Sequence, residues 1–387
     1  MAANPNASES AQRVLDYLQE VSTSEQVLMG QHVAYRMDYM TTGFRNHVQP
    51  IFDQTGRWPS LIGADYGYGI SATELTNGNQ ILIDYWNRGG LISISSHFNN
   101  PWTGGDGHNL TDRNHTELIT PGTAVYDVWM ADLDRVADGL SELQDAGVVV
   151  LWRPLHEMTM PNTWWWGWDP DWGDAGPFRN VWTHMFDYFT NTRGLNNLLW
   201  VYSAGNTDSY NPVDMCYPGD AYVDLLGIDV YSDTLEIRGD GYNRLLALGK
   251  PLALTEFGPQ IRDGTYDNMT TINRIRESFS AIVYVLQWSS WANNQVAIAD
   301  NRNATRLMAD PWVVDRDELD GQLVAPMPEN LTSVLAEIQT VASDLRGTAD
   351  RLEAQVSAIQ SDLTRIQRLD LAFDRLAAWA RDLTDDV

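Results

Sequence analysis

Cysteine and lysine are nearly missing from this chain, and long apolar runs are missing altogether. The single cysteine, Cys216, cannot form an intrachain disulfide and is expected to be a buried free thiol. Lys250 is the only lysine, so arginine supplies nearly all of the positive charge. No stretch of about 20 consecutive apolar residues occurs, which excludes a membrane-spanning helix. The sequence therefore predicts a protein that depends neither on disulfides nor on membrane insertion.

The shortage of positive charge also excludes two classes of partner. The formal net charge of −27 would repel the phosphates of nucleic acids and of anionic membrane surfaces. Hydrophobic residues make up 43% of the 387 residues, which is enough for a folded core. The 16 tryptophans and 16 tyrosines suit either sugar stacking or core packing. We therefore expect a folded protein that acts on a neutral substrate.

Eight short apolar segments alternate with helical segments along the first 325 residues. This alternation is typical of an α/β fold, the (β/α)8 TIM barrel, whose active site lies at the carboxyl ends of the strands. Helices are predicted at Glu9–Val21, Gln80–Arg88, Thr123–Ala146, Pro177–Thr192 and Asp267–Phe279. Strands are predicted at Gln26–Met29, Leu61–Ala64, Leu91–Ser95, Val148–Trp152, Leu198–Ser203, Val223–Val230, Pro251–Thr255 and Ile282–Gln287.

A second region, residues 326–387, differs sharply in composition. After Pro326 and Pro328, apolar residues recur in steps of four and three from Leu331 to Ile366, which is the seam of a coiled coil. The series then slips by a short interruption and continues at Leu369. A long helix packed back on the barrel is the alternative. We favour a coiled-coil tail that joins copies of the chain into a homo-oligomer, because the seam is narrow and the other faces are polar.

Two glutamates at predicted strand ends are candidates for catalysis. Glu157 follows the fourth strand and Glu256 follows the seventh, so both face the same mouth of a closed barrel. A retaining glycosidase needs two such carboxyl groups about 5 Å apart, one as acid/base and one as nucleophile. A glutamate at a strand end can also be a structural ion-pair partner. The residues around each glutamate are therefore needed to choose between a catalytic and a structural role.

The sequence motifs around both glutamates resemble those of a known family. LWRPLHEM with the following WWWG loop, and ALTEFGP downstream, resemble glycoside hydrolase family 26, whose best-known members are endo-β-1,4-mannanases. The resemblance runs from about Gln26 to Asp320 and includes NTRGLNNLLWVYS, YPGDAYVDLLGIDVY and LGKPLALTEFGPQ. It implies that Glu157 is the acid/base and Glu256 the nucleophile. Desolvation by the neighbouring tryptophans would favour the protonated form of Glu157.

The resemblance also implies substrate-binding residues. Tyr231 would lie beside the nucleophile and donate a hydrogen bond to it, while His97 and His156 would hold the sugar. Trp288 would form a stacking floor. Each of these four residues has a structural alternative, as a core aromatic or a satisfied buried histidine. Arg153 is interpreted as a buried guanidinium that fixes a carboxylate.

The tryptophan loop departs from the family pattern. Close relatives place a tryptophan five residues after the acid, where this chain has Asn162. Met160–Thr163 lengthens the loop, so that Trp164 is its first aromatic residue. Trp164 is therefore predicted as a substrate contact, while Trp165 or Trp166 is expected to pack in the core. Subsite preference is the property that this departure affects.

These residues predict a secreted retaining endo-β-1,4-mannanase. Its substrate would be a β-mannan polysaccharide, namely mannan, galactomannan or glucomannan. The alternatives are a β-1,3-xylanase or mixed-linkage β-glucanase of the same family, or a non-catalytic sugar-binding barrel multimerised by its tail. MAANPNASES is not a signal peptide and fits either a mature end or a cytoplasmic protein. No cofactor or metal is expected, since the sequence has neither an HExxH motif nor a glycine-rich phosphate loop after a strand.

Overall fold

The computed structural model describes residues 1–67, 71–208, 210–319, 323, 352, 355, 356, 360 and 363, and of residue 172 only the backbone. Most of the predicted tail, 326–387, therefore lies outside the described residues. Within the described part of the chain, no helix is long and apolar enough to cross a membrane.

Eight parallel strands form a closed barrel, as the sequence predicted. The strands pair in the order β2 to β8 and then β1, and pairing of β1 with β2 closes the ring. Nearly every strand residue is buried, which explains why the strands are continuous apolar runs rather than alternating patterns. The strands are β1 (Val27–Ala34), β2 (Leu61–Asp65), β3 (Leu91–Ser96), β4 (Val150–Pro154), β5 (Leu198–Gly205), β6 (Leu225–Tyr231), β7 (Leu252–Gly258), β8 (Ile282–Gln287) and the short outer strand β9 (Val313–Val314), which pairs with β1.

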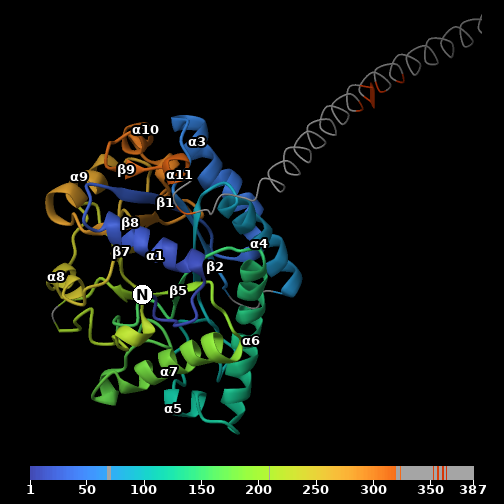
Figure 1. Cartoon of the computed structure of the whole chain (residues 1–387), viewed down its shortest axis with the longest axis vertical. Coiled ribbons are helices and arrows are strands. Elements are labelled where there is room, and N and C mark those ends of the chain that lie inside the picture. The colour runs from blue at the N-terminus through green and yellow to red at the C-terminus, as the bar shows by residue number, and fades with distance from the viewer. Residues whose placement is uncertain are drawn as a thin grey trace, which may run out of the picture. The chain divides into compact units, whose positions relative to one another are not determined.

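Helices surround the barrel, and α4 and α6 lie side by side along one flank (Figure 1). The first helix has the predicted bounds. Ser8 caps it through a hydrogen bond from the Ala11 amide, and one face of the helix is buried. The helices are α1 (Glu9–Val21), α2 (Met40–Gly43), α3 (Gln49–Thr55), α4 (Ala72–Trp86), α5 (His115–Leu118), α6 (Ala124–Asp145), α7 (Gly176–Asp187), α8 (Gly241–Leu246), α9 (Met269–Ser278), α10 (Ala304–Met308) and α11 (Arg316–Leu319).

Helix α4 and strands β1 and β7 differ from their predicted bounds in ways that bear on the site or its surroundings. Helix α4 begins at Ala72, eight residues before the predicted start, because Ser71 and Glu74 form a capping box. Gly78 lies within that helix and packs against Met37 at a distance that leaves no room for a side chain. Strands β1 and β7 also extend past their predicted ends, so that Glu256 lies within β7 rather than after it.

Candidate active site

A cleft of about 700 Å³ opens at the carboxyl ends of the barrel strands. The two predicted carboxylates, Glu157 and Glu256, both line it. Its wall also includes every predicted sugar-contacting residue, and five residues that sequence reasoning did not single out. The full lining is Tyr35, His97, His108, His156, Glu157, Trp164, Tyr231, Glu256, Arg262, Trp288, Ser289 and Trp291.

Glu157 lies just past β4 in an unusual backbone conformation. Its φ is 56°, in the left-handed region that costs a residue with a side chain roughly 1–3 kcal/mol. The Glu157 amide donates to the carbonyl of Ser203 on β5 (2.8 Å), and Trp164 Nε1 donates to Glu157 Oε2 (2.8 Å). Burial, together with the negative charges of Asp229 and Glu256, raises the pKa of Glu157 to about 8. This carboxyl group therefore holds a proton at neutral pH, as an acid catalyst must.

Glu256 on β7 accepts hydrogen bonds from two neighbouring side chains. Arg153 Nη2 donates to its Oε2 at 2.9 Å, and the Tyr231 hydroxyl donates to its Oε1 at 2.7 Å. Burial and the negative charge of Glu256 raise the pKa of Tyr231 well above its ordinary value, so the hydroxyl keeps its proton and remains a donor. Both neighbours donate hydrogen bonds to this carboxyl group, and the guanidinium of Arg153 also carries a positive charge. A carboxylate held in this way is suited to attack as a nucleophile.

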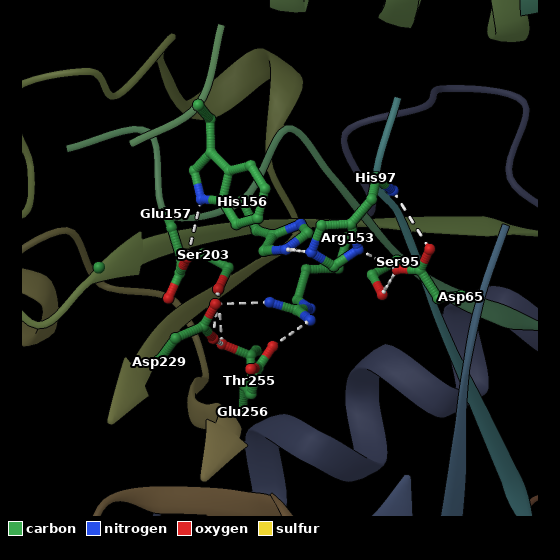
Figure 2. A network of polar contacts seen from close by, with 12 residues as sticks. Asp65, Ser95, His97, Arg153, His156, Glu157, Ser203, Asp229, Thr255 and Glu256 are labelled. Atoms are coloured by element: carbon green, nitrogen blue, oxygen red, sulfur yellow. Dashed lines mark hydrogen bonds and ion pairs between the residues drawn. The ribbon is translucent and has the colours of Figure 1, made fainter. Parts of the chain in front are cut away.

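Asp229 is a third acid in the network, and its role was missed from the sequence (Figure 2). Arg153 Nη1 donates to Asp229 Oδ2 at 2.6 Å, so one guanidinium joins Asp229 and Glu256. The hydroxyls of Ser203 and Thr255 each donate to Asp229 Oδ1 at 2.8 Å. Burial raises the pKa of Asp229 to about 6, while Arg153 opposes that shift. The available signal was an acid that ends the apolar run of β6, two residues before Tyr231.

Arg153 therefore lies where the sequence placed it, under the carboxylates rather than on the cleft wall. It is 1% exposed. Although burial alone would lower its pKa, Asp229 and Glu256 raise the pKa of Arg153 above its ordinary value, so it remains charged. A buried ion pair of this kind is costly to break, because removing one partner leaves an unpaired charge.

A second network joins two histidines to a buried acid (Figure 2). His97 Nδ1 lies 2.7 Å from Asp65 Oδ2, and His97 Nε2 lies 3.0 Å from His156 Nε2. Burial opposes ionisation of Asp65, yet His97 and a hydrogen bond from Ser95 hold its pKa below the ordinary value. Burial and the nearby Arg153 keep the pKa of His156 well below its ordinary value, so its ring is neutral. The network thus fixes the orientation of both imidazoles at the cleft wall.

The tryptophan loop packs more tightly than its sequence suggested. Trp165 and Trp166 are both fully buried, and their indole nitrogens donate to the carbonyls of Phe98 (3.0 Å) and His156 (2.8 Å). Trp164 stacks on Trp166, with ring centroids 4.8 Å apart, and on His108, with centroids 3.9 Å apart. The rings of Trp166 and His108 are both nearly parallel to the ring of Trp164. They lie too close to that ring to fit side by side on one face, so each covers a different face. Trp164 lines the cleft with an edge only, because both of its faces are covered.

The comparisons with known proteins agree on one family. The model of glycosyl hydrolase family 26 matches residues 3–318. The chain belongs to glycosyl hydrolase family 26. It is 35% identical over 335 residues to "Mannan endo-1,4-beta-mannosidase A and B" of Caldalkalibacillus mannanilyticus, covering 82% of this chain and 63% of that protein. It is 33% identical over 344 residues to the mannan endo-1,4-beta-mannosidase of Bacillus subtilis, covering 84% of this chain and 91% of that protein.

Solved structures give the same result. A Bacillus subtilis mannanase called BCman superposes with a TM-score of 0.74 at 31% identity, covering 84% of this chain and 98% of that one. A second Bacillus subtilis structure, titled mannanase man26, gives a TM-score of 0.73 at the same identity. The resemblance stated from the sequence motifs is therefore confirmed.

Two further tryptophans line this cleft. Trp288, which follows β8, stacks on the buried His32 with ring centroids 3.7 Å apart. One face is thereby covered, which leaves the other for the cleft that Trp288 lines. Trp291 is 39% exposed and lies under the guanidinium of Arg262, 5.0 Å from the ring centroid. Neither Trp291 nor Arg262 has a sequence signal beyond its position after a strand.

A divalent metal would have to compete with Arg153. Among the described residues, His156, Asp229 and Glu256 offer ligand atoms that all lie within 4.8 Å of one another. The guanidinium already contacts both of these carboxylates, at 2.6 and 2.9 Å. Its fixed positive charge and its hydrogen bonds take the role that a cation would have there. The arrangement fits family 26 hydrolysis by carboxyl groups better than a metal site.

Proposed function

We propose that this chain is a retaining endo-glycoside hydrolase that cleaves internal β-1,4-mannosidic bonds in mannan, galactomannan or glucomannan. The observation that carries this proposal is the contrast between the two cleft carboxyl groups. The pKa of Glu157 is raised to about 8, while Glu256 accepts hydrogen bonds from Arg153 and Tyr231. A pair of carboxyl groups with opposed environments is what double displacement requires. The names of the family 26 relatives supply the substrate.

In the proposed mechanism, Glu256 attacks the anomeric carbon of the sugar while Glu157 protonates the departing glycosidic oxygen. The covalent glycosyl–enzyme then forms on Glu256. Glu157, now ionised, takes a proton from water, which attacks the same carbon and releases the sugar with its configuration retained. Arg153 and Tyr231 stabilise the charge on Glu256 before attack and after release.

The remaining site residues bind and orient substrate in this proposal. His97 and His156 hold the sugar at the cleavage point, and the free face of Trp288 forms the floor beneath it. Trp164 contacts substrate by its edge only, since both of its faces are covered. No cofactor takes part.

Product analysis tests the reaction and the linkage together. The protein is incubated with linear mannan, galactomannan, β-1,3-xylan and mixed-linkage β-glucan, and the first anomer released is followed by NMR. We expect mannooligosaccharides that appear first as the β-anomer. Release of the α-anomer would overturn the retaining mechanism, and cleavage of xylan or glucan in place of mannan would identify the rival specificities. Full turnover on mannan by Glu256→Ala would overturn the assignment of the nucleophile, while inactivity of the wild type on all four polymers would favour the non-catalytic barrel.

We further propose two domains: residues 1–325 as the catalytic barrel and residues 326–387 as a coiled-coil tail that pairs with a second copy of the chain. Contacts cluster separately within these two ranges, which supports the division. Leu352, Val356 and Leu363 belong to the predicted seam, and each is helical and more than half exposed. Such residues are stabilised when a second helix covers them. Because mannan is an extracellular polymer, we also propose that the protein is secreted.

A further inference from the structure

We propose that His108 is the sugar platform of the first subsite on the leaving-group side of the cleft. This inference rests on the proposed function, in which Glu157 protonates the leaving oxygen. The sugar bonded to that oxygen therefore lies beside Glu157, next to the residues that pack around this acid. Those residues are Trp164, which donates to Glu157, and His108, which covers Trp164.

Trp164 cannot be the platform itself. Its ring lies between Trp166 on one side and His108 on the other, and its Nε1 is bonded to Glu157. A sugar stacks on an open aromatic face, and no open face of Trp164 remains. His108 is the outermost ring of this stack. It is exposed and lines the cleft, so its outer face is the one that a sugar can reach.

Hydrogen bonds hold the His108 ring in a fixed orientation. Its Nδ1 lies 2.9 Å from the carbonyl oxygen of Thr163, which can only accept, so Nδ1 carries the hydrogen. Its backbone amide donates to Asp106 Oδ1 at 3.0 Å. In the neutral ring, Nε2 then presents a lone pair to which a sugar hydroxyl can donate. The imidazole thus offers both a flat surface and one polar contact.

The segment 99–114 that carries His108 is joined to the lengthened tryptophan loop. The carbonyl oxygen of Gly107 accepts a hydrogen bond from the Trp165 amide at 2.9 Å. Arg113 donates a hydrogen bond to Asn162 Oδ1 at 3.0 Å and forms an ion pair with Asp169 at 2.7 Å. These contacts hold the segment 99–114 against the tryptophan loop and keep His108 over Trp164, beside the acid.

Two mannose substrates with different leaving groups test the proposal. Hydrolysis of mannopentaose places a sugar in the leaving-group subsite, whereas β-mannobiosyl fluoride leaves that subsite empty. For His108→Ala we expect kcat/KM on mannopentaose to fall about tenfold, as expected for losing one ring contact to the bound sugar. On the fluoride we expect less than a twofold change. The matched control is His47→Ala, which also removes a histidine bonded to a backbone carbonyl but lies outside the cleft lining.

His108→Phe separates stacking from loop anchoring. Phenylalanine keeps a flat ring against Trp164 but loses the hydrogen bond to Thr163, so we expect it to regain most of the activity on mannopentaose. The inference is overturned if the wild type cleaves both substrates and His108→Ala leaves their ratio unchanged. It is equally overturned if His108→Phe matches His108→Ala and both lose activity on the fluoride, which would mean that His108 only anchors the loop. A wild type inactive on both substrates would instead refute the proposed function.

Discussion

Trp164 donates a hydrogen bond to Glu157, and this bond sets the direction in which the pH dependence of activity should change when Trp164 is replaced. The indole donor stabilises ionised Glu157 and so lowers its pKa, against the larger effect of burial. Trp164→Phe removes the donor but keeps a ring under His108. We expect the basic limb of the kcat/KM profile, which reports loss of the Glu157 proton, to move up by about one pH unit, since a hydrogen bond to a charged group is worth roughly 1.5 kcal/mol.

The measurement is kcat/KM on mannopentaose between pH 5 and pH 10. Trp312→Phe is the control, because Trp312 lies outside the cleft lining and should leave the limb in place. A basic limb that stays fixed, or that moves to lower pH, would show that Trp164 does not act on the acid.

Glu157 also links stability to pH. Its pKa is about 8 in the folded protein against 4.5 for an ordinary glutamate, so between these values the folded state binds a proton that the unfolded state has lost. Stability from this group is therefore fully present below pH 4.5 and is lost as pH rises through 8. Glu157→Gln cannot ionise and escapes this loss, although its activity falls about a thousandfold.

Thermal melts of Glu157→Gln and wild type at pH 4.5 and pH 9 test the linkage. We expect the variant to gain several degrees relative to wild type at pH 9 and little at pH 4.5. Glu236→Gln, an exposed acid outside the cleft lining, should show no pH-dependent difference. A gain of equal size at both pH values would mean that the carboxyl group is not held protonated.

At the scale of elements, the segment 99–114 and the tryptophan loop fit together because Gly107 has no side chain. A Cβ at this position would lie 2.9 Å from Trp166, closer than real Cβ contacts come, and 3.0 Å from Trp164, tighter than most of them. Gly107→Ala must therefore push one of the two rings away, and Trp164 would carry its hydrogen bond to Glu157 with it. We expect kcat/KM on mannan to fall about tenfold while the barrel stays folded, a loss typical of a displaced catalytic group.

Kinetics on mannan and a far-ultraviolet circular dichroism spectrum check this expectation. Gly241→Ala, at the start of α8, is the control, because its new Cβ would meet only side chains at 3.2 Å or more. Unchanged kinetics for Gly107→Ala would show that the two segments are not coupled to the acid.

The elements also show what the sequence could and could not reveal. The barrel strands were predictable because each is a buried apolar run bounded by polar residues, and Ile282–Gln287 matches in both ends. The carboxylates and Arg153 could be placed because they lie at strand ends, whose meeting point is set by the barrel. The stack of His108 on Trp164 could not be, since it depends on how two irregular segments pack and has no periodic pattern. Asp229 was missed because a single acid after an apolar run is a weak signal until Arg153 is seen beside it.

For the whole molecule, the charge of −27 bears on how two copies could associate. Acidic barrels repel one another, so association needs a surface whose apolar contact outweighs that repulsion, and the predicted seam of the tail offers one. We expect the full chain to sediment as a dimer or higher oligomer at moderate salt. Removal of residues 329–387 should give a monomer with unchanged kcat/KM on mannopentaose, because the cleft lining lies entirely within the barrel.

Sedimentation equilibrium of the full chain, the truncated chain and a Leu352→Asp, Val356→Asp double variant decides the role of the tail. Each substitution places a charge at a seam position, which two paired helices could bury only at high cost. The double variant should therefore lose the oligomer as completely as the truncation does. The control variant Gln355→Asp, which changes a neighbouring polar position, should keep it. An oligomer that survives truncation would place the interface on the barrel. A monomeric full chain would leave the exposed seam to bind something other than a second copy.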